Sequence, residues 1–154
     1  MSGWLAIAGL GPGGQALVTP QVAAALEAAS DVVGYFPYVD RVPVRAGQAR
    51  HASDNREELA RARHALALAA SGRGVVVVSS GDPGVFAMAS AVCEALEHGP
   101  AAWGDVEVQV LPGITAMLAA SARAGAPLGH DFCAINLSDN LKPWTLIERR
   151  LSLT

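Results

Sequence analysis

Apolar residues along this chain gather in short runs, several of which end at polar residues and glycine. The clearest run is Val75 to Val78, which is followed at once by Ser-Ser-Gly-Asp-Pro-Gly at 79–84. Four consecutive β-branched residues are typical of a strand that is covered on both faces, as in parallel sheets. Related patterns predict further strands at 4–9, 32–35, 106–110 and 132–136.

Helical periodicity fills the segments between these strands. Thr19 followed by Pro20 predicts the cap and first position of a helix over 20–29, because proline lacks an N–H that the helix leaves unpaired there. Asp54 opens an Asp-x-x-Glu capping pattern before a second helix. By the same reasoning, Asp82 and Pro83 predict a third helix directly after the central strand. The remaining predicted helices cover 114–123 and the residues from 145 onward.

Strands that alternate with helices predict an α/β fold. We expect one doubly wound domain with a mainly parallel five-stranded sheet and helices on both faces. Ligands of such sheets bind at the carboxyl ends of the strands. Glycine-containing turns follow three predicted strands, at 9–14, 79–84 and 112–116, and the turn at 79–84 is the leading candidate for the site. The chain has no Gly-x-Ser-x-Gly nucleophile elbow, which favours binding and positioning of ligands over covalent catalysis.

Gly9, Gly11 and Gly14 spell the G-x-G-x-x-G pattern of dinucleotide-binding proteins. That pattern works when a helix begins within the glycine run and directs its N-terminal amides at a pyrophosphate. Here Pro12 interrupts the run, and the best helix start comes later, at Thr19. The second predicted strand also ends without the acidic residue that such proteins use to bind ribose. The sequence therefore disfavours a classical NAD site.

The composition, 51% hydrophobic and 16% charged over 154 residues, is that of a globular protein with one core. No apolar run approaches the ~18 residues of a membrane span, and the first one lacks a basic flank, so we expect a cytoplasmic protein without a membrane segment. The net charge of −3 and a single lysine, Lys142, argue against nucleic-acid binding. Cys93 and Cys133 lack the spacing of a zinc site, so we expect no metal and two buried thiols.

Six of the ten arginines lie within 41–63. Such a cluster can bind a ligand with several carboxylates, because a guanidinium pairs with a carboxylate through two hydrogen bonds. A solvated loop and helix face is the alternative, and the sequence favours it. For the four scattered histidines we expect surface or capping roles. The aromatic residues Tyr35, Phe36 and Tyr38 either line a pocket for a flat ligand or cover an edge of the sheet.

Four motifs recur in order over the whole chain. They are Gly-Leu-Gly-Pro-Gly at 9–13 with Thr-Pro at 19–20, Ser-Ser-Gly-Asp-Pro-Gly-Val at 79–85, Leu-Pro-Gly-Ile-Thr-Ala at 111–116, and Asp-Phe-Cys-Ala-Ile-Asn-Leu-Ser-Asp at 131–139 with Pro-Trp at 143–144. Together they resemble the tetrapyrrole methylases, the S-adenosylmethionine-dependent enzymes of corrin and sirohaem synthesis. Within that family, the Gly-Tyr-x-x-Tyr-Val-Asp block at 34–40 is most similar to the ring-contracting enzymes of cobalamin synthesis.

The resemblance implies S-adenosylmethionine as the methyl donor and a carboxylate-rich precorrin as the substrate. It implies methylation of the precorrin at ring carbon C(17), coupled to loss of one bridging carbon from the macrocycle. It also implies that the donor is contacted by Pro12, Ser80, Gly81, Asp82, Val85, Thr115 and Ala116.

The resemblance does not supply a general base. In related uroporphyrinogen methylases a carboxylate follows the tyrosine of the second strand, whereas this chain has Phe36 at that position. Tyr38, Asp40 and Asp139 are the nearby candidates for a catalytic residue.

The family has a second α/β domain that closes the cleft and completes the donor site. We therefore expect the N-terminal α/β domain at 1–143 and the start of a linker or second domain, truncated, at 144–154. We expect a homodimer, and weak donor binding by the 154-residue chain alone. Two alternatives stay open: another precorrin methylase or the diphthine synthase branch, against which the blocks at 38–40 and 137–139 argue, and a noncatalytic remnant that retains part of the donor site.

Overall fold

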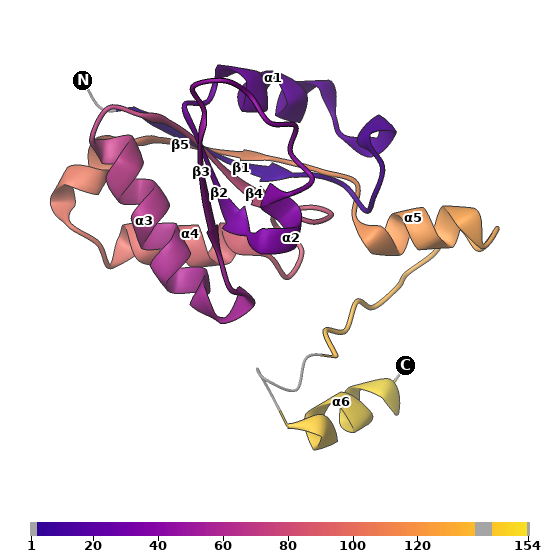
Figure 1. The fold of residues 1–154 in the computed structure, drawn as a ribbon. Helices are drawn as coiled ribbons and strands as arrows, with labels where there is room; N and C mark the ends of the chain where they lie inside the picture. Colours follow the sequence, from indigo (N-terminus) through magenta and orange to yellow (C-terminus); the bar gives the residue numbers. More distant parts are fainter. Residues whose placement is uncertain (1–2, 138–142, 154) are drawn as a thin grey trace.

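The computed structural model describes residues 3–137 and 143–153 (Figure 1). One sheet forms the centre of the fold, with strand order β3-β2-β4-β1-β5 and parallel pairing throughout. The strands are β1 (Trp4–Gly9), β2 (Asp31–Tyr35), β3 (Ala49–Ser53), β4 (Gly74–Ser79) and β5 (Glu107–Leu111). The predicted parallel five-stranded sheet is therefore confirmed.

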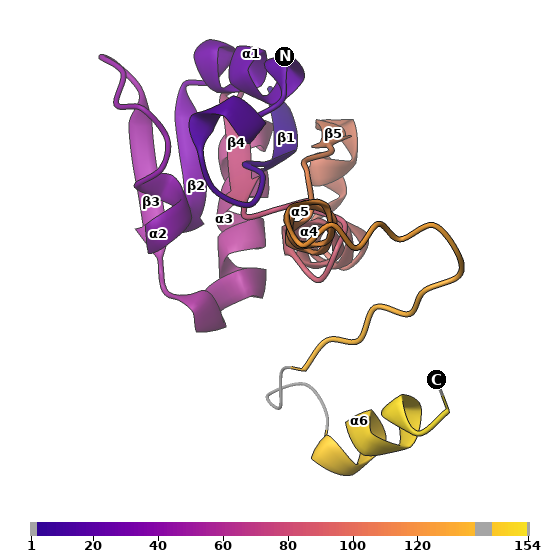
Figure 2. The same cartoon turned by 90° about the vertical axis from the view of Figure 1, so that its right-hand side faces the viewer.

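Helices cover both faces of this sheet, as expected for a doubly wound fold (Figure 1). On one face lie α1 (Pro20–Ala28) and α2 (Phe36–Val39), and on the other α3 (Glu58–Ala70) packs beside α4 (Met88–Glu97). Further along the chain are α5 (Ala116–Arg123) and α6 (Trp144–Leu151), of which α6 lies apart from the sheet in both views (Figures 1 and 2). Short 3-10 turns are formed by Gln15–Leu17, Asn55–Glu57 and Ala101–Asp105. None of the helices in the described residues is long and apolar enough to cross a membrane.

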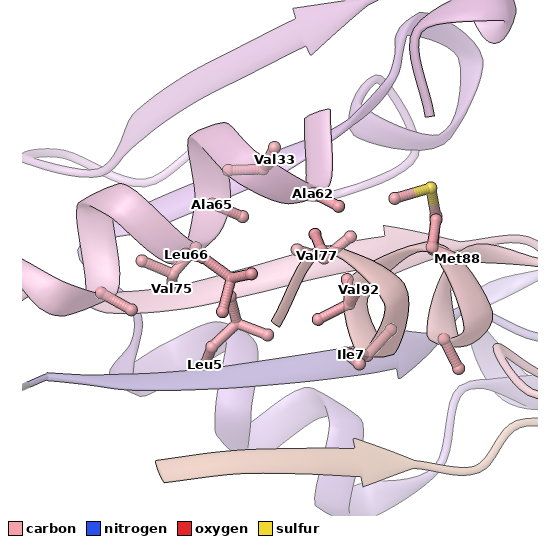
Figure 3. Close-up of a cluster of buried hydrophobic side chains, with 14 of the residues drawn as sticks. Leu5, Ile7, Val33, Ala62, Ala65, Leu66, Val75, Val77, Met88 and Val92 are labelled. Carbon is pink, nitrogen blue, oxygen red and sulfur yellow. The ribbon is translucent and has the colours of Figure 1, made fainter. Parts of the chain in front are cut away.

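Alternate residues of the central strands supply two separate cores, since successive side chains of a strand point to opposite faces. Leu5, Ile7, Val75 and Val77 meet Leu66 and its neighbours beneath α3 and α4 (Figure 3). The intervening residues meet α1 on the opposite face, and the members of that second core include Ala6, Ala8, Val76, Val78, Val22 and Leu26. Full burial of each such aliphatic side chain stabilises the fold by roughly 1.5–3 kcal/mol. The valine run of β4 is thus explained by burial on both faces.

The first helix begins where the sequence predicts. The Thr19 hydroxyl accepts a hydrogen bond from the Val22 N–H at 3.3 Å, and Pro20 opens α1. The Asp54 carboxylate likewise accepts from the Asn55 N–H, at the start of the short turn that leads into α3. The α-helix that follows β1 therefore begins after the glycine run and not within it, as the sequence predicted.

The predicted start of the helix after β4 is wrong. α4 begins at Met88, and the preceding residues form turns, so Asp82 caps no helix and Pro83 does not occupy a first helical position. The Asp82 carboxylate accepts hydrogen bonds from the Gly84 and Gly113 N–H groups instead. Asp82 and Gly113 are far apart in the sequence, so their hydrogen bond forms only in the folded chain. The local sequence around Asp82 therefore predicted a helix cap instead.

One strand was placed incorrectly and another was missed. Residues 132–136 form irregular chain and not a strand, whereas β3 (Ala49–Ser53) was not predicted. β3 is an edge strand whose residues are half-buried or exposed, so it lacks the apolar pattern of the central strands. The expectation of buried thiols is also wrong, because Cys93 and Cys133 are both exposed.

Candidate functional site

The turns that follow β1, β4 and β5 meet at the carboxyl edge of the sheet. Gly11 and Gly81 exchange two backbone hydrogen bonds of 3.2 and 3.0 Å in an antiparallel bridge. A Cβ added to Gly113 would lie 2.2 Å from the Gly81 carbonyl oxygen and 2.7 Å from that of Gly9. No side chain fits between backbones at these distances, so glycine at position 113 is required for the three turns to touch.

The carboxylate of Asp82 ties two of these turns together. Its Oδ2 accepts from the Gly113 N–H at 3.0 Å, and its Oδ1 accepts from the Gly84 N–H at 2.8 Å. Hydrogen bonds to a charged acceptor are stronger than those between neutral groups. Asp82 therefore fixes the distance between the turn after β4 and the turn after β5.

A cavity of about 460 Å³ opens beside this junction. Six of the seven residues that the sequence assigned to the donor site line it, namely Ser80, Gly81, Asp82, Val85, Thr115 and Ala116. The seventh, Pro12, is not part of this lining, although the preceding residue, Gly11, bridges to the cavity wall. The fold thus gathers two sequence-distant motifs around one space.

Sequence reasoning missed the apolar half of this lining. The missed residues are Phe86, Met117, Leu128, Phe132, Cys133, Ala134 and Ile135. Four of them belong to the segment interpreted as a strand, which instead runs past the cavity. The signal that could have found them was the motif at 131–139 itself, which had been used for the resemblance but not for the site.

A second cavity, of about 370 Å³, shares lining residues with the first, Phe86 among them. Tyr38 lines this second cavity, and its ring also makes an edge-to-face contact with Tyr35 at 5.3 Å between centroids. Asp40 is exposed at the end of α2 and lines neither of these two cavities, while Asp139 lies outside the described residues. Of the two base candidates that the structure describes, Tyr38 is the one placed beside the site.

Phe86 stands in a strained conformation between the two cavities. Its φ angle is +53°, and no other non-glycine residue in the described ranges has a positive φ. Such a conformation costs on the order of 1–3 kcal/mol. The side chain is 63% exposed, so burial of the ring offsets little of this cost. Backbone strain held at the boundary of two cavities is typical of a functional position.

Three arginines of the 41–63 cluster do not form the solvated face that the sequence favoured. Arg41 donates to the carbonyls of Leu10 and Gly13 at 2.7 Å each and so stiffens the glycine turn after β1. Arg50 donates to carbonyls at the end of α2 and just beyond it. Arg61 is buried. These guanidinium groups hold loops in place at the carboxyl edge of the sheet.

A polar network lies at the opposite end of β2. The buried Asp31 carboxylate is hydrogen-bonded to Arg73 Nε at 2.5 Å and to His51 Nε2 at 2.8 Å, and His51 Nδ1 lies 3.0 Å from His64 Nε2. Burial raises the pKa of Asp31, but hydrogen bonds from Arg73, Ser30 and His51 outweigh burial and hold this pKa below its usual range. Burial and the neighbouring His51 lower the pKa of His64. Because none of these side chains lines either of the two cavities, we assign the network a structural role.

The lining offers hydroxyls, backbone groups and apolar side chains. Among the described residues, no group of three His, Cys, Asp or Glu side chains is placed to hold a metal ion. The fold and site therefore define an α/β domain with a cavity of small-molecule size at the carboxyl edge of a parallel sheet. Residues 5–152 match the family of Tetrapyrrole (Corrin/Porphyrin) Methylases. The chain belongs to this family, as its motifs had indicated.

Individual relatives are similar over nearly the whole chain. A precorrin-3B C(17)-methyltransferase from Sinorhizobium sp is 61% identical over 153 residues, which are 99% of this chain and 60% of that protein. The crystal structure of the methyltransferase CobJ matches with a TM-score of 0.92 at 67% identity, covering 97% of this chain and 62% of that one. A Thermus thermophilus uroporphyrin-III C-methyl transferase complexed with S-adenyl homocysteine matches with a TM-score of 0.61 at 29% identity, covering 87% and 57%. The chain thus spans about 60% of the length of its Sinorhizobium relative.

Proposed function

We propose that this chain forms part of an S-adenosylmethionine-dependent methyltransferase of cobalamin biosynthesis. The proposed reaction is C(17) methylation of precorrin-3B with ring contraction to precorrin-4. The observation that carries the proposal is the cavity beside the β4 turn, which is lined by six of the residues assigned from the family motifs. The 61% identity to a precorrin-3B C(17)-methyltransferase supports the choice of substrate.

The cavity suits S-adenosylmethionine in size and chemistry. Its volume of about 460 Å³ falls within the range of roughly 300–1,000 Å³ typical of small-molecule sites. Gly81 has a φ of +61°, and the nearest atom to an added Cβ there lies 3.6 Å away, so a ligand can approach the backbone closely. Ser80 and Thr115 supply hydroxyls for polar groups, and Phe132 supplies an apolar wall for a flat ring. The proposed donor contacts are Pro12, Ser80, Gly81, Asp82, Val85, Thr115 and Ala116.

In this mechanism the protein acts by positioning two reactants. When bound, S-adenosylmethionine supplies a methyl group on a sulfonium, which the ring carbon takes as the carbon–sulfur bond breaks. Asp82 keeps the walls of the donor cavity at a fixed distance, and Phe86 separates that cavity from the one proposed for the tetrapyrrole. Well-oriented reactants gain up to roughly 7–11 kcal/mol relative to free collision, so alignment supplies much of the rate.

Tyr38 is our first candidate for the group that handles a proton during the reaction, and Asp40 and Asp139 are the others. The position of Tyr38 in the second cavity supports this order, because a proton acceptor must reach the bound substrate.

We also propose the domain organisation and assembly. Residues 1–143 would be the N-terminal α/β domain, and 144–154 would begin a linker or second domain that closes the cavity. α5 has no buried residue, and Leu118 on it is 48% exposed, which supports a covering partner for this side. A homodimer and a cytoplasmic location complete the proposal, and the free cysteines agree with a reducing compartment.

The test is methyl transfer in a reconstituted mixture. The chain is combined with the carboxyl-terminal part of the Sinorhizobium relative, labelled S-adenosylmethionine and precorrin-3B, and the label in the tetrapyrrole is measured by chromatography with mass spectrometry. We expect labelled precorrin-4 from the mixture and little from the chain alone. The intact relative serves as the positive control. A mixture whose parts co-purify but transfer no label, beside an active control, would contradict the proposal and favour a noncatalytic remnant.

A further inference from the structure

Arg61 is a buried cation at the carboxyl edge of the sheet. It lies in α3, close to the amino end of that helix, and its exposed fraction is 4%. Its Nε donates to the Ser53 hydroxyl at 2.9 Å, and its Nη2 donates to the Asp54 carbonyl. The guanidinium is thus held in a fixed orientation by the end of β3 and the turn that follows it.

The charge of Arg61 has no carboxylate partner at contact distance. Within residues 3–137 and 143–153, the ion pairs are those of Arg45, His51 and Arg73, and none includes Arg61. Burial lowers the pKa of Arg61, against the opposing effect of the acidic residues near the start of α3. A buried charge is costly unless it is paired, so an anion bound beside Arg61 would offset part of this cost.

The guanidinium also has donors to spare. Of its five N–H groups, one on Nε and one on Nη2 make the hydrogen bonds described above. Nη1 faces the sulfur of Met88 at 3.4 Å, and a thioether is a weak acceptor. A carboxylate oxygen would replace this contact with a charge-assisted hydrogen bond.

Arg61 lines the cavity of about 370 Å³ that adjoins the proposed donor cavity. Tyr38 and Asn55 line the same space and add a hydroxyl and an amide. The exposed Glu58 also belongs to the lining, and it disfavours small free anions that lack other contacts. Phe86 offers an apolar face at the boundary with the donor cavity. The combination fits a carboxylate attached to a flat apolar body.

We propose that Arg61 binds a side-chain carboxylate of the tetrapyrrole and so orients the macrocycle towards the donor cavity. This inference rests on the proposed function, and it assigns the substrate subsite to the second cavity. It also distinguishes Arg61 from Arg41 and Arg50, because Arg61 lines the second cavity whereas Arg41 and Arg50 do not.

The experiment measures two ligands on the same variants of the chain, each combined with the carboxyl-terminal part of the Sinorhizobium relative. The probe for the subsite is uroporphyrin III, a carboxylate-rich tetrapyrrole, titrated by absorbance, and the probe for the donor cavity is S-adenosylhomocysteine, titrated by calorimetry. The variants are Arg61→Met, which removes the charge, Arg61→Lys, which keeps the charge without the fork geometry, and Arg63→Met. Arg63 is the matched control, because it is an exposed arginine of the same helix.

We expect Arg61→Met to weaken uroporphyrin III binding roughly 10- to 100-fold, the loss of one charge-assisted contact, with a smaller loss for Arg61→Lys. Arg63→Met leaves this affinity unchanged, and S-adenosylhomocysteine binding stays the same in all variants. Equal uroporphyrin III affinity in wild type and both Arg61 variants would overturn the inference and leave the proposed function standing. Absence of saturable uroporphyrin III binding by the wild type would overturn the proposed tetrapyrrole substrate, and the subsite with it. If Arg61→Met fails to fold, the comparison of Arg61→Lys with wild type decides the question.

Discussion

Removal of the Asp82 carboxylate tests the junction of the three turns. The Asp82→Ala variant leaves the N–H groups of Gly113 and Gly84 without their acceptor. The bond to Gly113 is partly buried and charge-assisted, so it contributes about 1.5–3 kcal/mol, whereas water replaces the exposed bond to Gly84 at a cost of about 0.5 kcal/mol. We therefore expect the free energy of unfolding to fall by about 2–3.5 kcal/mol. Asp82→Asn keeps one acceptor oxygen, and we expect about half this loss.

Urea unfolding followed by circular dichroism measures this change, with an unchanged slope showing that the unfolded state is comparable. Because the released turns widen the cavity, we also expect S-adenosylhomocysteine affinity to fall roughly 10-fold or more, which calorimetry measures. Asp105→Ala is the control, because Asp105 is exposed in a turn remote from the junction. A loss below about 0.5 kcal/mol for Asp82→Ala would refute the bridging role of this carboxylate. An unchanged ligand affinity would remove Asp82 from the binding site.

The core, the histidine pair and Phe86 give three more expected outcomes. Leu66→Ala removes a fully buried side chain and lowers the free energy of unfolding by about 2–5 kcal/mol in urea, whereas Leu118→Ala, at a half-exposed position, changes it by less than about 1 kcal/mol. The pKa of His64 is lower in the folded chain than in the unfolded chain, so the unfolded chain binds the proton first and stability falls as the pH drops through about 6.5. We expect His64→Gln to reduce the fall in melting temperature between about pH 8 and pH 5. An identical pH profile of the melting temperature for the variant and the wild type would contradict this assignment. Phe86→Gly relieves the positive φ and raises stability by up to about 1 kcal/mol while weakening S-adenosylhomocysteine binding, whereas Phe36→Gly in helical α2 lowers stability by about 0.5–1 kcal/mol. A Phe86→Gly variant less stable than wild type would contradict the strain argument.

The sequence predicted those strands whose burial is visible in residue type. β4 is covered on both faces, and its valines therefore identified it without other information. β3 was not predicted, because its polar sequence resembles that of a loop. Its Arg50 and His51 side chains are hydrogen-bonded to residues elsewhere in the fold, which the sequence does not reveal. The opposite error occurred at 132–136, where Phe132 and Ile135 line the cavity of about 460 Å³ and do not belong to the sheet. Apolar residues that line a cavity therefore show the same sequence pattern as apolar residues of a strand in the core.

The sequence predicted which turns form the candidate site, but it did not predict how the residues of these turns contact one another. The motifs identified Ser80, Asp82 and Thr115, since glycine turns after strands mark the ligand edge of α/β sheets. They did not reveal that Asp82 contacts Gly113, because an aspartate before proline has the same local signature whether it caps a helix or bridges two loops. The position of Arg61 was likewise invisible, because the burial of one arginine among six depends on which face of α3 packs against the sheet.

The position of β4 in the sheet determines the order in which the strands can pair during synthesis. β1 pairs with β4 and β5 in the described sheet, so during synthesis β1 has no partner in this sheet until residues 74–79 have emerged. β2 and β3 can pair earlier, once residue 53 has emerged, but two strands alone are marginal in water. The nascent chain therefore carries an unpaired apolar segment, 4–9, until residue 79 has emerged, and exposed apolar surface of this kind promotes aggregation. Pairing of β4 with both neighbours then joins β1 to the β2–β3 pair, whereas the cavity of about 460 Å³ forms only after residues 115–135 have followed.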